Sequence, residues 1–111
     1  MEISKGEILG LKKLVNSNII KKIYPMIDHI DVNVYTSRSV ISDKYQWLGF
    51  DIHLNDPEIT EENMWDKGFD PHYLVDYHIR KLLPYLSLEN ILSLSFHVFS
   101  PTGELISHYT I

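Results

Sequence analysis

The sequence predicts an α+β fold in which two helices pack on one face of a four-stranded, mostly antiparallel sheet. Three observations support this fold class. Apolar and other side chains alternate without interruption in Trp47 to Leu54, as in a strand with one buried face. Three further stretches share this period of two, and two segments carry apolar residues at helical spacing. The element order is helix, strand, strand, helix, strand, strand, and we expect one domain over residues 1–111.

The N-terminal helix is predicted to begin at Ser4, because Ser4 and Glu7 have the spacing of a capping box. Pro25 disfavours helical geometry at Tyr24 and should end the helix there. Ile20 lies outside the main apolar stripe and is expected to touch a second surface. That stripe contains Ile8, Leu11, Val15, Ile19 and Ile23.

The first hairpin joins a strand over 28–37 to the strand that contains Ile52. Val34 and Ile52 both point inward and both have even residue numbers. The residue numbers of any two residues paired across this hairpin must therefore add up to an even value. This excludes a two-residue turn at Asp43 and Lys44. We expect a loop of odd length, or a bulge, near 42–44.

The connection over 55–69 is long for a compact domain, so we expect a short helix inside it. Thr60 can cap that helix, and Gly68 can take the left-handed position after its end. This connection is the most acidic part of the chain.

The second main helix is predicted to start at Asp70 and Pro71, a favourable cap and first residue. Pro84 should stop or kink it. The buried stripe contains Val75, Ile79, Leu82 and Leu83, and the opposite side carries Tyr73, Tyr77 and Arg80.

The last two strands are expected over 92–98 and 104–111. They are joined by a type I turn at Ser100 to Gly103, which has Pro at its second position.

Composition excludes several classes of function. The formal net charge of -5 opposes binding to nucleic acid and favours a basic protein as partner. The chain has no Cys, so disulfides, thiol nucleophiles and Cys-rich zinc sites are excluded. No apolar run is long enough to span a membrane, and the start lacks the pattern of a signal peptide. We therefore expect a cytoplasmic protein.

The predicted sheet leaves one face uncovered. Exposed aromatic side chains on such a face indicate a contact site, although a loop or a second subunit could cover them. The residues of this face are Asn33, Tyr35, Trp47, Asp51, His53, His97 and His108.

Asp51, His53, His97 and His108 could act as an acid and base set or bind a metal. Surface histidines are more often only solvated, so no residue is assigned a catalytic or metal-binding role and no cofactor is predicted. The sequence contains no phosphate-binding glycine loop, no HExxH and no GxSxG, which favours a protein that is not an enzyme.

These features favour a small acidic protein that binds and inhibits a basic partner. In size, acidity and absence of Cys, the chain resembles the immunity proteins with which bacteria block nuclease toxins, as in toxin–antitoxin pairs. The expected partner-binding residues are Tyr35, Trp47, Asp51, His53, Glu58, Glu61, Glu62, Trp65 and Asp66.

Two alternatives remain open at this point. One is a small metal-binding or hydrolytic enzyme that uses Asp51, His53, His97 and His108. The other is a structural or assembly protein of a phage or mobile element, with a homodimer through Tyr73 and Tyr77.

Overall fold

The computed structural model describes residues 3–37, 45–88, 91 and 93–110. Its strands form one four-stranded sheet, in which the pairs β1–β2 and β3–β4 are antiparallel and the central pair β2–β3 is parallel. In sheet order, the strands are β1 (Ile27–Ser37), β2 (Tyr45–Leu54), β3 (Leu94–Phe99) and β4 (Leu105–Thr110). The α+β class and the mostly antiparallel sheet are as predicted.

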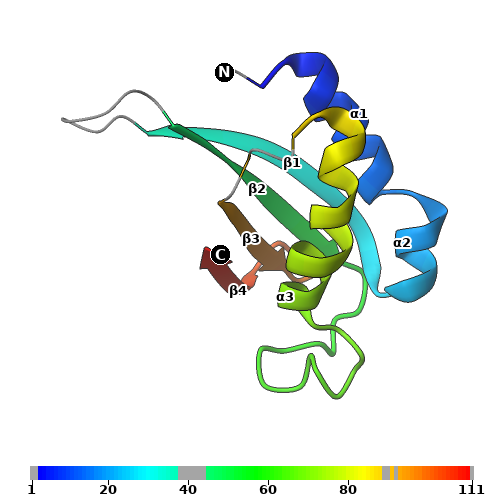
Figure 1. The fold of residues 1–111 in the computed structure, drawn as a ribbon. Helices are drawn as coiled ribbons and strands as arrows, with labels where there is room; N and C mark the ends of the chain where they lie inside the picture. The colour runs from blue at the N-terminus through cyan, green and yellow to red at the C-terminus, as the bar shows by residue number, and fades with distance from the viewer. Residues whose placement is uncertain (1–2, 38–44, 89–90, 92, 111) are drawn as a thin grey trace.

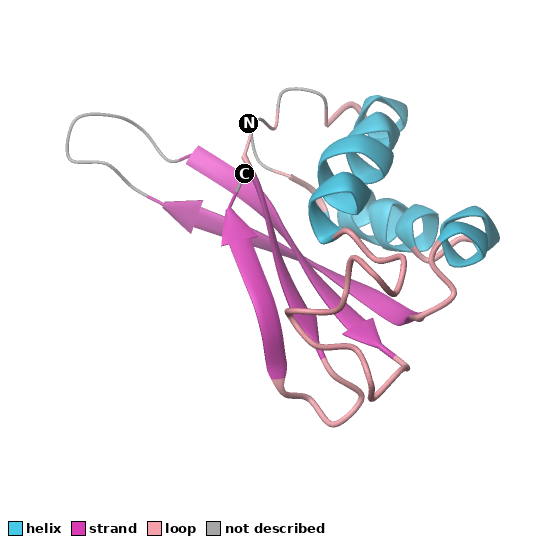
Figure 2. Ribbon diagram, turned by 90° about the horizontal axis from the view of Figure 1, so that it is seen from below, coloured by secondary structure: helices cyan, strands magenta, loops and turns pink. Residues whose placement is uncertain are grey.

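The helices lie together on one side of the sheet (Figures 1 and 2). The N-terminal pair is α1 (Lys5–Val15) and α2 (Asn18–Ile23). The second helical segment runs through α3 (Pro71–Tyr73), the π-helix η1 (Leu74–Ile79) and the 3₁₀-helix η2 (Arg80–Leu86).

The core lies between these helices and the apolar side of the central strands. Leu48, Phe50 and Ile52 of β2 are each 0% exposed, so the predicted alternation is confirmed. Burial of one such side chain is worth about 1.5–3 kcal/mol. This row therefore holds the helices to one face of the sheet and leaves the other face for polar and aromatic side chains.

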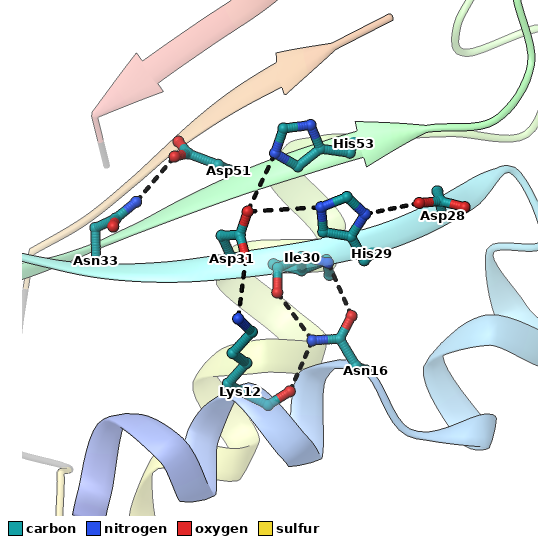
Figure 3. A network of polar contacts seen from close by, with 9 residues as sticks. All are labelled: Lys12, Asn16, Asp28, His29, Ile30, Asp31, Asn33, Asp51 and His53. Atoms are coloured by element: carbon teal, nitrogen blue, oxygen red, sulfur yellow. Dashed lines mark hydrogen bonds and ion pairs between the residues drawn. The ribbon is translucent and has the colours of Figure 1, made fainter. Parts of the chain in front are cut away.

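The N-terminal helix differs from the prediction, because it breaks between Val15 and Asn18. The side chain of Asn16 fills this break. Its Nδ2 donates to Lys12 O at 2.7 Å and to Ile30 O at 2.8 Å, while Ile30 N donates to its Oδ1 at 2.8 Å (Figure 3). Ile30 belongs to the edge strand β1, so the Asn16 amide pairs with the edge as a neighbouring strand would.

The break changes which side of α2 is buried. Ile20 is only 4% exposed, whereas Ile19 and Ile23 are 71% and 45% exposed. The predicted single stripe is therefore wrong beyond Val15. The capping box of Ser4 and the buried positions Leu11 and Val15 are confirmed.

The short helix predicted after Thr60 is replaced by turns. Thr60 N donates to Asn63 Oδ1 at 2.7 Å, and Asn63 N donates to Thr60 Oγ1 at 3.3 Å. The Nδ2 of Asn63 also donates to Glu58 O at 2.8 Å. Gly68 has the expected left-handed geometry, with φ of +83°, and ends the segment before a regular helix develops.

The start of the second helical segment is confirmed, since the side chain of Asp70 accepts from Tyr73 N at 3.2 Å and Pro71 is the first residue. Pro84 does not stop the helix at once. It lies inside the 3₁₀-helix η2, which ends at Leu86 before the left-handed Ser87. In the predicted stripe Val75, Ile79 and Leu83 are buried, and Leu82 is half-buried.

The first hairpin agrees with the register prediction. Val34 pairs with Leu48, and the sum of their numbers is even. The predicted loop near 42–44 and position 92 lie outside the described residues. In the second hairpin, Gly103 N donates to Ser100 O at 3.0 Å, as expected of a turn there.

We predict that Asn16→Ala lowers the free energy of unfolding by about 1–3 kcal/mol, because it leaves the N–H and C=O of Ile30 without their partner. Chemical denaturation measures this difference. Ser17→Ala is the matched control, since the Ser17 side chain makes no capping hydrogen bond, and its effect should stay within about 0.5 kcal/mol. Equal effects of the two substitutions would contradict the role of Asn16.

Candidate functional site

The strand register arranges the side chains opposite the helices in rows across the sheet. We call this surface the open face. The rows are His29, His53 and Phe99; Asp31, Asp51, His97 and His108; Asn33, Gly49, Ser95 and Thr110; and Tyr35 with Trp47. All residues predicted for the uncovered face lie in these rows. The prediction missed His29 and Asp31, although they share the period of two with Asn33 and Tyr35.

The aromatic end of the open face is the Tyr35–Trp47 pair, whose rings stack at 5.4 Å with 22° between their planes. The pair borders a hollow of about 340 Å³ that also includes Ser95 and Thr110. Gly49 makes this arrangement possible. A Cβ at Gly49 would lie 2.3 Å from Cε2 of Tyr35, so the tyrosine ring occupies the space that any other residue would need.

The predicted acid and base set is divided by the structure. Asp51 accepts from Asn33 Nδ2 at 2.9 Å, and its Oδ1 lies 3.5 Å from His97 Nδ1. The rings of His97 and His108 stack with centroids 6.0 Å apart. The ring of His53, in contrast, faces the carboxylate of Asp31. The four predicted residues therefore do not form one cluster.

His53 instead joins a cluster with His29 and Asp31, which we call the histidine cluster (Figure 3). Oδ2 of Asp31 lies 3.5 Å from His29 Nε2 and 3.3 Å from His53 Nε2. One ligand atom from each residue falls within 4.8 Å of the others, which makes this a candidate metal site.

The second oxygen of Asp31 is paired with a cation, because its Oδ1 lies 3.2 Å from Lys12 Nζ. Partial burial raises the pKa of Asp31, but the hydrogen bond and charge of Lys12 act in the opposite direction. The two imidazoles lower it further, and the net pKa is below the ordinary carboxyl value. Asp31 is therefore an ionised acceptor at neutral pH.

A second candidate surface lies where the acidic turns meet α2 and α3. Trp65 is 70% exposed and borders a hollow of about 300 Å³. The other residues of this hollow are Ile23, Tyr24, Gly68, Phe69, Asp70, Tyr73 and His78. Together with the neighbouring carboxylates of Glu61, Glu62 and Asp66, this hollow forms what we call the tryptophan patch.

The carboxylates beside Trp65 are available to a partner. Within the described part of the chain, Glu61, Glu62 and Asp66 are exposed and make no ion pair or side-chain hydrogen bond. Glu58 differs, because it lies 3.4 Å from Lys67 Nζ.

The predicted partner-binding residues therefore fall on two surfaces. Two hollows mark them, and no residue lines both. The open face holds Tyr35, Trp47, Asp51 and His53, and the turns before α3 hold Glu58, Glu61, Glu62, Trp65 and Asp66.

Two exposed tyrosines of the second helical segment form a stack at the tryptophan patch, where Tyr73 also lines the hollow. Tyr73 and Tyr77 stack at 4.6 Å, and Lys81 Nζ lies 3.7 Å from the ring centroid of Tyr77. One turn apart on this segment, Arg80 Nε lies 2.8 Å from Asp76 Oδ1 in an ion pair. Dimerisation through these tyrosines stays a prediction.

Comparisons with protein-family models, with curated proteins and with solved structures find no match. Among the described residues, no helix has both the length and the apolar character needed to cross a membrane.

We predict that Gly49→Ala destabilises the protein by about 1–3 kcal/mol, because the new methyl group displaces the ring of Tyr35. In a Tyr35→Ala background the same substitution should cost clearly less, since the ring is gone. A double-mutant cycle by urea unfolding measures this coupling. Additive effects of the two substitutions would show that the ring and Gly49 do not interact.

We also predict a pH effect from His78, whose ring meets the rings of Tyr24 and Tyr73 edge-on. Partial burial, with a smaller contribution from the charge of Lys81, lowers the pKa of His78 below its ordinary value of 6.5. The unfolded chain then binds more protons than the folded one below that pH, so stability falls as the pH falls through this range.

Unfolding of the wild type and of His78→Gln, measured at about pH 7.5 and about pH 5, tests this effect. The wild type should lose more stability than the variant between these values. An equal loss in both proteins would contradict a protonation penalty at His78.

Proposed function

We propose that this chain is a small acidic protein-binding module that inhibits a basic partner, as immunity proteins inhibit nuclease toxins. The observation that carries the proposal is the exposed Trp65 beside three carboxylates that form no ion pair with any residue in the described ranges. An exposed large aromatic with charge around it has the composition of an interface centre and its rim.

The centre of the proposed interface is apolar. Trp65 and the half-exposed Tyr73 and Ile23 border one hollow, and Ile19 lies one turn before Ile23 on the same side of α2. The buried Phe69 forms part of the lining. A partner side chain that fills this hollow would displace water from both tryptophan and tyrosine, which are frequent hot-spot residues.

The rim supplies the charge. Glu61, Glu62 and Asp66 can meet lysines or arginines of a partner without first breaking an ion pair to any of the described residues. Together with the net charge of -5, they should accelerate association with a basic protein and repel nucleic acid. The same acidic rim opposes a symmetric homodimer through this surface, because it would place like charges opposite each other.

The open face is a weaker candidate for this electrostatic role. Asp31 is paired with Lys12, and Asp51 accepts a hydrogen bond from Asn33.

An inhibitor of a nuclease must occupy the compartment of the nucleic acid, so we place its action in the cytoplasm as part of the same proposal.

The first test uses the purified chain as bait in a lysate of the source cells, with washes at low and high salt. We expect a stoichiometric basic protein that is retained at low salt and whose enzymatic activity the chain suppresses. A captured protein whose activity is unaffected, or recovery of the chain alone as a concentration-dependent oligomer, would contradict the inhibitor proposal.

Variants then locate the interface. Glu61→Lys combined with Glu62→Lys should slow association by about 10-fold or more and reduce its salt dependence. Glu104→Lys, in the turn of the second hairpin, is the charge control and should leave the rate nearly unchanged. Stopped-flow or surface-based kinetics at several salt concentrations measure both. The double substitution raises the net charge by four units and the control by two, so a control that lowers the logarithm of the rate half as much as the double variant would show that net charge alone acts.

Trp65→Ala tests the apolar centre in the same assay. We expect a loss of about 2 kcal/mol or more in binding free energy, mainly as faster dissociation. Tyr85→Ala is the matched control, because Tyr85 is 81% exposed but does not line the hollow. Unchanged dissociation of the Trp65 variant would exclude this patch as the interface.

A further inference from the structure

We propose that the histidine cluster of His29, Asp31 and His53 is a binding site for Zn²⁺ or a similar divalent transition metal. This inference does not depend on the proposed function, because the cluster lies on the open face and shares no residue with the tryptophan patch.

The distances within the cluster fit a shared metal ion. Ligands about 2.1 Å from a tetrahedral zinc ion lie roughly 3.4 Å from one another. Oδ2 of Asp31 already lies 3.5 Å from His29 Nε2 and 3.3 Å from His53 Nε2. All three ligand atoms fall within 4.8 Å of one another, but the His29 and His53 rings stack nearly parallel, so one ring must tilt out of the stack before both nitrogen lone pairs point at one ion.

The surroundings of His29 support the same assignment. Its Nδ1 lies 2.7 Å from Asp28 Oδ2, which places the proton on Nδ1 and directs the lone pair of Nε2 toward Asp31. A carboxylate behind a ligating histidine is the usual outer partner in zinc sites. The register shift between Ile27 and His29 marks a bulge, which lets consecutive side chains approach each other.

The ring of His53 is held from both sides. It stacks on His29 at 4.3 Å and on Phe99 at 5.1 Å. The contact with Phe99 limits the side-chain entropy that His53 loses on binding an ion, whereas the stack with His29 must open before both rings face that ion.

Charge and access also favour a cation here. Asp28 and Asp31 together outweigh the charge of Lys12, which engages the other oxygen of Asp31. A hollow of about 540 Å³ opens beside the cluster between Asp28, His29, His53 and the turn that contains Pro101 and Gly103. It gives an ion a path from solvent and leaves room for a water ligand.

The ligand types select the metal. Two imidazoles and one carboxylate suit zinc, nickel, copper and iron rather than Mg²⁺ or Ca²⁺, which prefer oxygen ligands. Three protein ligands with one open position are typical of accessible zinc sites rather than closed structural ones. We therefore expect an exchangeable ion on the surface of a protein that folds without it.

Isothermal titration of the tag-free, chelator-treated protein with Zn²⁺ at neutral pH tests the proposal. We expect one equivalent to bind, and His29→Ala and His53→Ala each to abolish this stoichiometric step. Asp28→Asn should weaken binding by about 10- to 100-fold while retaining the site. His97→Ala and His108→Ala are matched controls on the same face and should bind Zn²⁺ as the wild type does. Thermal melting without metal verifies that each variant is folded.

Nuclear magnetic resonance of the ¹⁵N-labelled imidazoles of the wild type gives a readout that needs no substitution. Zn²⁺ should shift the Nε2 signals of His29 and His53 and leave the signals of His108 unchanged. Absence of stoichiometric binding, retention of binding by both alanine variants, or loss of binding in the His108 variant would overturn the proposal.

Discussion

The pairing of β2 with strands on both sides is the constraint on which the rest of the structure depends. Its antiparallel pairing with β1 requires only a hairpin, but its parallel pairing with β3 requires the chain to cross one face of the sheet. The apolar row of Leu48, Phe50 and Ile52 determines which face is crossed, because these side chains are buried on the side of the sheet where the helices lie (Figure 2). The opposite face is then free for histidines, carboxylates and aromatic rings.

The same crossover creates the tryptophan patch. After β2 the chain turns back toward the helices, and the buried Ile59, Met64 and Phe69 hold this return to the core. The side chains between these buried residues must point outward, which exposes Trp65 and its neighbouring carboxylates. Because the turns are fixed by the core and by Asn63, a partner would meet a preorganised surface and would lose little conformational entropy in ordering it.

The two surfaces also differ in their internal chemistry. On the open face, side chains of neighbouring strands stack on one another or form ion pairs, as in the His29, His53 and Phe99 row. At the tryptophan patch, Glu61, Glu62 and Asp66 lack such partners among the described residues. Charge that is unpaired among the described residues and surrounds an exposed indole suits a protein partner.

Features with local causes could be predicted from the sequence. The strand alternation, the cap at Asp70 and the left-handed Gly68 depend on neighbouring residues, and the structure confirms them. The break at Asn16 could not be predicted, because it depends on a bond to Ile30 across the fold.

The histidine cluster was missed for a related reason. The apolar pattern requires that the residue numbers of two paired residues of β1 and β2 add up to an even value. It does not determine that value, and so it does not determine which residues are paired. Only the actual register places His29 opposite His53. The residues of the open face were thus predictable, whereas the contacts between strands were not.

We propose that protein recognition occurs at the tryptophan patch and not on the open face. The chain has two tryptophans, and each reports on one surface: Trp47 on the open face and Trp65 on the patch. The most direct test is ¹⁹F nuclear magnetic resonance of the fluorotryptophan-labelled chain, titrated with its captured basic partner. The account predicts a large chemical-shift change for Trp65 and little change for Trp47. A shift of Trp47 with an unchanged Trp65 signal would contradict it.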